Sequence, residues 1–278
     1  MSEFRIIDSH CHIYPDAIAR KAVEAVDRFY DGLPGEAWDG TVQTLLNSGR
    51  AAGISRFVVH SVATRPEQVS SINHFIARSV ASSEGAFIGM GTMQLDSDDL
   101  ERDLDELVSL GLRGGKLHPD IQRFRVDEPR AMRMFSMCED RNLPVCVHTG
   151  DFRYDYSNPA RVANVLRAFP KLRFIGAHFG GWSVWDEAAL LLPEFPNLIV
   201  DSSSTFYTVP PDKGKALIRA YGADRVLFGT DYPLWHQQPD IEYLLRLELT
   251  NEEYEAIFWR NAARLFALEF DEQEDVQS

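Results

Sequence analysis

Ile6-Ile7-Asp8-Ser9-His10-Cys11-His12 is the stretch of sequence that decides the fold. With Arg5 it begins as an apolar run, which predicts a strand over Arg5–Ser9 that is buried on both faces. It ends in polar residues, with two histidines two positions apart. Side chains two apart on an extended chain share a face, so both imidazoles can reach one metal ion at about 2.0–2.1 Å. Such a pair also arises by chance, so the rest of the chain has to support it.

Apolar runs of similar length recur along the chain and alternate with helical patterns. The expected strands are Arg5–Ser9, Arg56–His60, Ala86–Gly91, Leu112–Leu117, Pro144–His148, Arg173–Ala177, Asn197–Asp201 and Arg225–Gly229. Helical spacing between them is seen in the apolar series Ile18, Ala22, Val26 and Phe29. Strand–helix alternation with eight strands predicts a single (β/α)8 TIM barrel over residues 1–268, followed by an acidic tail at 269–278. An open doubly wound sheet is the alternative, but no GxGxxG follows the first strand.

Composition and charge limit the kinds of partner that the protein is expected to bind. The chain has 278 residues and a formal net charge of −14, which argues against nucleic acid or an anionic membrane as a partner. Cys11, Cys138 and Cys146 lack CxxC spacing, which argues against a disulfide framework and favours the cytoplasm. No signal-peptide core or run of about 18 apolar residues is present. We therefore expect a cytoplasmic protein acting on a small molecule, and homo-oligomerisation is left open.

Histidines and charged residues gather where the expected strands end. These segments are Asp8-Ser9-His10-Cys11-His12, Lys116-Leu117-His118-Pro119, His148-Thr149-Gly150, His178-Phe179-Gly180-Gly181 and Gly229-Thr230-Asp231-Tyr232-Pro233, and His60 closes the second strand. In a barrel the carboxyl ends of the strands meet on one face, where catalytic loops lie. Histidine with carboxylate suits zinc best, and manganese, iron or cobalt next. Structural readings remain open for single residues, since Asp231 could cap a turn and Lys116 could form a salt bridge.

The same segments, in this order, resemble the amidohydrolase superfamily. The resemblance is greatest to the amidohydrolase-related branch that includes aminocarboxymuconate-semialdehyde decarboxylase. It implies a (β/α)8 fold and a metal, expected to be Zn2+, held by His10, His12, His148 and Asp231. It also implies that His178 orients or polarises the substrate and that Asp231 moves a proton. Binuclear members carry a carbamylated lysine near the place of Lys116, whereas members of this branch are mostly mononuclear.

Two reactions follow from such a site. The leading hypothesis is hydrolysis of an amide, ester or lactone, in which the metal activates water, His178 stabilises the oxyanion and Asp231 transfers the proton. The alternative is non-oxidative decarboxylation of an unsaturated or aromatic acid. We expect Lys116, His118 and His178 to contact the substrate, and a carboxylate partner for Lys116 fits both reactions. A non-catalytic metal-binding barrel is a third reading, disfavoured by the complete ligand set.

Overall fold

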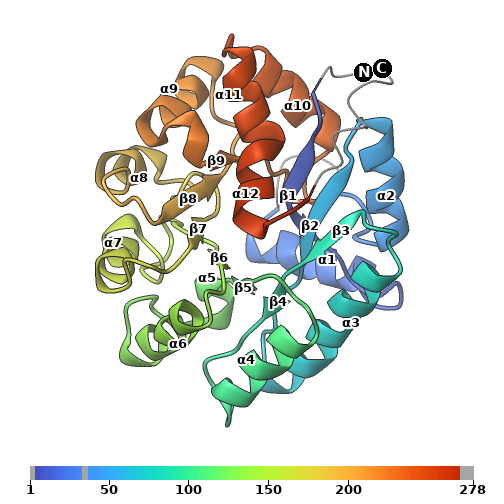
Figure 1. Ribbon diagram of the computed structural model, residues 1–278, viewed down its shortest axis with the longest axis vertical. Helices are drawn as coiled ribbons and strands as arrows, with labels where there is room; N and C mark the ends of the chain where they lie inside the picture. The colour runs from blue at the N-terminus through green and yellow to red at the C-terminus, as the bar shows by residue number, and fades with distance from the viewer. Residues whose placement is uncertain (1–3, 33–36, 270–278) are drawn as a thin grey trace.

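The computed structural model describes residues 4–32 and 37–269 and shows a closed parallel barrel (Figure 1). The strands form two hydrogen-bonded ladders, β1-β2-β3 and β4-β5-β6-β7-β8-β9, in which every pair is parallel. The first ladder runs on into the second through β3 and β4, because Met90 N donates to Val59 O while Arg113 N donates to Gly89 O. At the other seam Ser9 N donates to Phe228 O. The predicted TIM-barrel fold is confirmed.

In the part of the chain that the structure describes, nine short strands thus occupy eight positions around the barrel, since β3 and β4 are two halves of one expected strand. Their bounds are β1 Ile7–His12, β2 Arg56–His60, β3 Phe87–Gly89, β4 Gly91–Thr92, β5 Gly115–Leu117, β6 Val145–Val147, β7 Phe174–Gly176, β8 Leu198–Asp201 and β9 Val226–Leu227. The expectation for the first strand was wrong at its end. β1 continues to His12, and its register against β2 shifts between Asp8 and Cys11.

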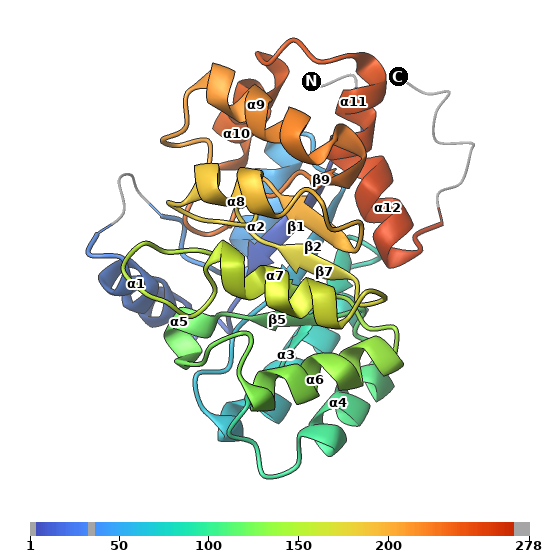
Figure 2. The same ribbon diagram turned by 90° about the vertical axis from the view of Figure 1, so that its left-hand side faces the viewer.

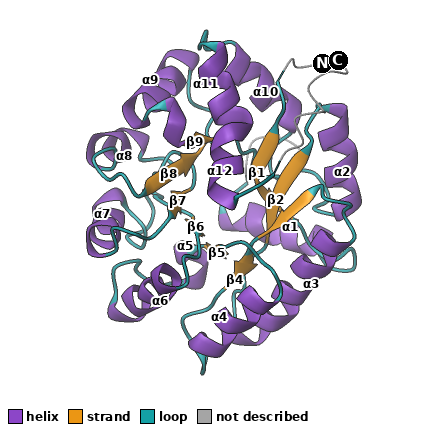
Figure 3. Cartoon of the chain, in the orientation of Figure 1, coloured by secondary structure: helices purple, strands orange, loops and turns teal. Residues whose placement is uncertain are grey.

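Most of the helices form the outer layer around the strands (Figure 3). They are α1 Ala19–Phe29, α2 Val42–Ala51, α3 Val69–Ala81, α4 Leu100–Ser109, α5 Pro119–Gln122, α6 Pro129–Asp140, α7 Pro159–Ala168, α8 Trp185–Leu191, α9 Pro211–Tyr221, α10 Gln237–Leu245, α11 Asn251–Glu255 and α12 Asn261–Phe266. Short 3-10 turns lie at Pro66–Gln68 and Ala223–Arg225, and a π-helical turn spans Ala256–Arg260. The Thr250–Glu253 capping box starts α11, satisfying otherwise unpaired N–H groups.

The two ends of the barrel differ in chemistry. Leu265 and Phe266 of α12 pack with Ile7, Val58 and Leu227 of the strands in one apolar cluster. Figure 2 shows α12 and α1 on opposite sides of the barrel. The end under α12 is therefore filled with apolar side chains, and the end near α1 is left for polar chemistry.

The remaining expectations concern the cysteines, the tail and membrane helices. All three cysteines are free, as their spacing led us to expect, and the structure shows that all three are buried. Residues 270–278 of the expected acidic tail lie outside the described residues. Among the helices that the structure describes, none has the length and apolar character needed to cross a membrane.

Candidate metal and substrate site

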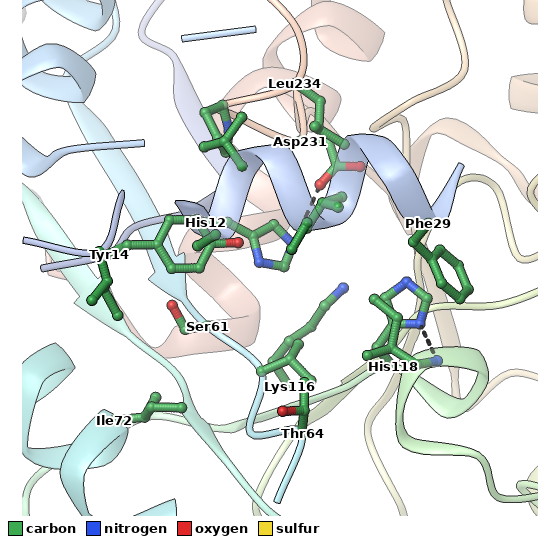
Figure 4. A pocket seen from close by; sticks show the side chains of 18 of the residues that line it. His12, Tyr14, Phe29, Ser61, Thr64, Ile72, Lys116, His118, Asp231 and Leu234 are labelled. Atoms are coloured by element: carbon green, nitrogen blue, oxygen red, sulfur yellow. Dashed lines mark hydrogen bonds and ion pairs between the residues drawn. The ribbon is translucent and has the colours of Figure 1, made fainter. Parts of the chain in front are cut away.

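One cavity of about 670 Å³ collects the side chains that the sequence singled out. Its lining includes every candidate residue, namely His10, His12, Lys116, His118, His148, His178 and Asp231. Figure 4 shows Lys116, His12, His118 and Asp231 pointing toward one open space. The carboxyl ends of β1, β5, β6, β7 and β9 supply these groups, as barrel geometry predicts.

His10, His12 and Asp231 converge at the centre of this site. Asp231 Oδ1 lies 3.4 Å from His10 Nε2 and 3.3 Å from His12 Nε2. Burial lowers the pKa of His12 to about 4, so its imidazole is neutral at pH 7 and keeps a free lone pair. Burial opposes ionisation of Asp231, but the neighbouring His10 and His12 hold its pKa well below the ordinary value. Two imidazole nitrogens and one carboxylate form a donor set that fits a divalent metal.

Asp201, at the end of β8, orients His10 and was not selected from the sequence. Its Oδ2 lies 2.9 Å from His10 Nδ1, and both side chains are fully buried. Burial opposes ionisation of Asp201, but its favourable electrostatic interaction with His10, including the hydrogen bond to Nδ1, lowers the pKa of the carboxyl group. Carboxylates at the second nitrogen of a histidine ligand fix its tautomer. The one available signal was an aspartate at a strand end, since Asn197–Asp201 was expected as a strand.

Lys116 of β5 points into the site, as its position on the expected fourth strand implied. Its Nζ lies 3.0 Å from His10 Nε2 and 3.7 Å from Cys146 Sγ, and the residue is only 1% exposed. Among the described residues no carboxylate forms a salt bridge with this ammonium. The lone pair that Lys116 contacts is the one that a metal on His10 would use, so cation and metal compete for it.

His148 does not join the His10–His12–Asp231 group in the structure. Its Nδ1 lies 2.9 Å from His178 Nε2, and its ring stacks on His118 with centroids 3.9 Å apart. Its Nε2 lies 3.5 Å from a carboxylate oxygen of Asp120. His118, Asp120 and His148 thus form a second cluster whose donor atoms lie within 4.8 Å of one another. The role of His148 as a metal ligand stays a prediction.

Asp120 is the second acidic residue that the sequence did not single out. Neither of its carboxylate oxygens has a hydrogen-bond partner among the described residues, and the residue is 3% exposed. Burial, together with the nearby Asp151 carboxylate, raises the pKa of Asp120 to about 8. Asp120 therefore carries its proton at pH 7 and can face the ring of His148 without an uncompensated charge. Its place in His118-Pro119-Asp120, after a strand-end histidine, was the available signal.

His178 is held rigidly at the end of β7. Its Nδ1 lies 2.9 Å from the carbonyl oxygen of Ser203, which fixes a hydrogen on that nitrogen. Burial lowers its pKa to about 4, so the ring is neutral. Its backbone has φ 60°, and that of Asp231 has φ 67°. Non-glycine residues rarely adopt these left-handed values, and such strain concentrates at functional sites.

His60, the last residue of β2, is buried beside the same group. Its ring lies edge-on to His10 and His12, with centroids 4.7 and 4.5 Å apart. Neither ring nitrogen has a hydrogen-bond partner among the described residues. His10, His12 and His60 together offer donor atoms within 4.8 Å of one another. The histidine cluster thus extends one residue beyond the predicted ligand set.

A family model described as amidohydrolase matches residues 7–268. The chain belongs to the amidohydrolase family. The resemblance found in the strand-end motifs is therefore confirmed. The chain is similar to a TIM-barrel protein of uncharacterised function from Bordetella bronchiseptica, with 24% identity, a TM-score of 0.81, and coverage of 95% of this chain and 99% of that one.

Two further solved structures share the fold of this chain. A dihydroxybenzoic acid decarboxylase from Polaromonas, with bound manganese and the inhibitor 2-nitroresorcinol, is 15% identical at a TM-score of 0.72, covering 99% and 100% of the two chains. A Pseudomonas putida protein assigned as a 2-pyrone-4,6-dicarboxylic acid hydrolase is 20% identical at a TM-score of 0.66, covering 96% and 99%. At these identities the likeness shows the fold alone, and function has to be argued from the site.

Proposed function

We propose that this member of the amidohydrolase family is a metal-dependent, non-oxidative decarboxylase of an aromatic or unsaturated carboxylic acid. The observation that carries the proposal is the buried Lys116 ammonium beside the His10–His12–Asp231 donor set, at the floor of a cavity with apolar walls. A carboxylate that enters this cavity finds a cation without a carboxylate partner among the described residues. Fold similarity to a manganese-containing aromatic acid decarboxylase supports the same reaction class.

The metal would be held by His10, His12 and Asp231, with His148 as the fourth proposed ligand. Zinc is our first candidate and manganese the second, since nitrogen and carboxylate donors accept both. When bound, the metal supplies a Lewis acid that polarises oxygen atoms of the substrate. The pKa of His12 near 4 means that this donor needs no deprotonation at neutral pH.

Different residues of the chain would bind the substrate and transfer the proton. Lys116 binds the substrate carboxylate and orients the bond that breaks. When carbon dioxide leaves, the electron pair of that bond stays on the ring or alkene carbon, which must take up a proton. Asp231 or His178, both of which line the cavity, would take up this proton from water and pass it to the carbon. The apolar side chains of the cavity lower the local dielectric constant, which strengthens these electrostatic contacts.

Hydrolysis of a carboxylated lactone or ester is the second candidate. It is favoured by fold similarity to the protein assigned as a pyrone dicarboxylic acid hydrolase. The same residues would serve, with His178 placed to stabilise an oxyanion and Asp231 to accept a proton from water. The two reactions differ in product, since only decarboxylation releases carbon dioxide.

The test is a substrate screen on purified protein of known metal content. Hydroxylated benzoic acids, unsaturated dicarboxylic acids and carboxylated lactones are supplied in parallel, and carbon dioxide release is scored separately from ring opening. The proposal expects metal-dependent carbon dioxide release from at least one acid. Turnover confined to lactones or esters would reject it in favour of hydrolysis.

A further inference from the structure

The cavity does not end at the metal donors but continues outward between α1 and α3. Its apolar lining comes mainly from α1, with Ala22, Val26 and Phe29, and from Ile72 and Phe75 of α3. The floor carries the histidines, Lys116 and Asp231. We call the part between the two helices the channel. Figure 4 shows Ile72 and Phe29 on different sides of the open space above Lys116.

The apolar spacing of α1 is explained by this channel. In the sequence, Ile18, Ala22 and Val26 recur at helical spacing, which ordinarily marks a face packed on the core. In the structure the buried residues of α1 are Ala19 and Val23, whereas Ile18 is 51% exposed. Apolar side chains that remain accessible along a cavity wall are typical of a ligand site.

The α3 wall is mixed in character. Besides Ile72 and Phe75 it presents polar side chains, and Thr64 precedes them on the same side. These polar lining residues are Thr64, Gln68, Ser71 and Arg78. The longest unbroken apolar contact is therefore along α1, from Phe29 near the floor to Ile18 at the helix start. The apolar part of a bound ligand would contact α1 on one side and both apolar and polar side chains of the α3 wall on the other.

The size of the cavity exceeds what a one-ring acid needs. Pockets of roughly 300–1,000 Å³ enclose ligands of drug size, and this cavity has about 670 Å³. A single-ring carboxylic acid seated at Lys116 would leave the space between α1 and α3 to water. Wetting an apolar wall costs free energy, which a longer ligand would recover by burying it.

We propose that the substrate is amphiphilic: a carboxylate head lies at Lys116, and an apolar tail of an alkyl chain or a second ring lies in the channel. The carboxylate head group rests on the proposed function. The apolar tail is inferred independently, from the α1 wall and the cavity volume. Each buried methylene of the tail should tighten binding roughly two- to fourfold.

The experiment is calorimetric binding of three unreactive probes to metal-loaded protein: benzoate, 4-butylbenzoate and biphenyl-4-carboxylate. The two larger probes should bind about tenfold tighter than benzoate or better. Ala22→Phe, which fills the channel, should remove most of that gain and leave benzoate within about twofold of wild type. Val26→Thr, nearly equal in volume, should reduce the gain partially. Ala81→Phe is the control, since Ala81 is exposed on α3 and outside the lining.

Equal affinity for all three probes would overturn the proposal. So would a stable dimer in sedimentation that Ala22→Phe dissociates, because a second copy would then occupy the channel. Circular dichroism checks that each variant is folded. Because no turnover is measured, the result is separable from the proposed function. Tight tail-dependent binding without carbon dioxide release from any acid would reject decarboxylation and leave the channel assignment standing.

Discussion

His10 Nδ1 and Asp201 Oδ2 lie 2.9 Å apart, with both side chains fully buried. An ionised carboxylate can only accept, so this contact fixes the hydrogen of His10 on Nδ1 and leaves the lone pair on Nε2. That lone pair faces Asp231 Oδ1 and Lys116 Nζ. The buried carboxylate of Asp201 thus determines that His10 offers Nε2 to the metal.

Removing this partner should weaken metal binding. We expect Asp201→Ala to lower zinc affinity by about 10–100-fold, because the tautomer and orientation of His10 are no longer held. Asp201→Asn should lose less, since its amide oxygen can still accept from Nδ1. Zinc dissociation constants are measured by chelator competition, with Asp103→Asn as a control for loss of a buried carboxylate elsewhere. Unchanged affinity in Asp201→Ala would show that His10 is not a ligand through Nε2.

Lys116 should matter for the substrate and not for retention of the metal. Lys116→Met removes the cation that contacts His10 Nε2, so zinc should bind at least as tightly as in wild type. The same change should raise KM for carboxylated substrates by about tenfold or more, as expected for loss of a buried charge-assisted contact. Metal content and steady-state kinetics on the same preparations check both parts. Loss of metal, with a carbamyl adduct found by mass spectrometry of wild type, would assign Lys116 as a metal-bridging residue instead.

Asp120 makes stability depend on pH in the metal-free protein. Its folded pKa of about 8 lies above the usual 3.8, so the folded state binds the proton more strongly than the unfolded state. This contribution is fully present below about pH 4 and is lost as pH rises toward 8. Asp120→Asn cannot ionise, so its free energy of unfolding relative to wild type should rise between pH 5 and pH 8. Urea unfolding at several pH values measures the difference. If the free energy of unfolding of Asp120→Asn minus that of wild type stays constant or falls with rising pH, the raised pKa of Asp120 is contradicted.

Most of the barrel could be predicted from sequence, because buried parallel strands leave a strong signal. Arg56–His60 was predicted with both bounds correct, and the remaining expected strands each contain or overlap an observed one. The end of β1 was not predictable from alternation alone, since the register shift between Asp8 and Cys11 depends on pairing with β2. The split of the third strand at Met90 likewise reflects its neighbours on both sides.

Some features of the site could likewise be predicted from the sequence, and others could not. Residues at strand ends could be placed together because barrel strands point their carboxyl ends to one face. Asp201 and Asp120 could not be assigned, since their roles depend on which histidine nitrogen they face. The apolar series on α1 was visible, but its spacing does not distinguish a core face from a cavity wall. That distinction comes from how α1 lies over the barrel (Figure 2).

Asp231 is the residue on which the chemistry should depend most. Asp231→Asn keeps the size and one oxygen donor but loses the basic oxygen, so much of the metal should remain bound. Activity should fall by on the order of 100-fold or more, as for loss of a general acid–base group. His178→Asn should also slow turnover, but without removing the acidic limb of the pH–rate profile. A metal-loaded Asp231→Asn enzyme with near wild-type kcat and an unchanged acidic limb would exclude Asp231 as the proton carrier.

Carbon dioxide release as a function of bound metal tests the central claim most directly. Wild-type protein is stripped with a chelator, reloaded stepwise with zinc or manganese, and assayed on the best acid from the screen. We predict that release is absent in the stripped protein, rises in proportion to metal up to one ion per chain, and stays absent in His10→Ala and His12→Ala. Release that persists after stripping, or metal-dependent hydrolysis without carbon dioxide, would contradict the account.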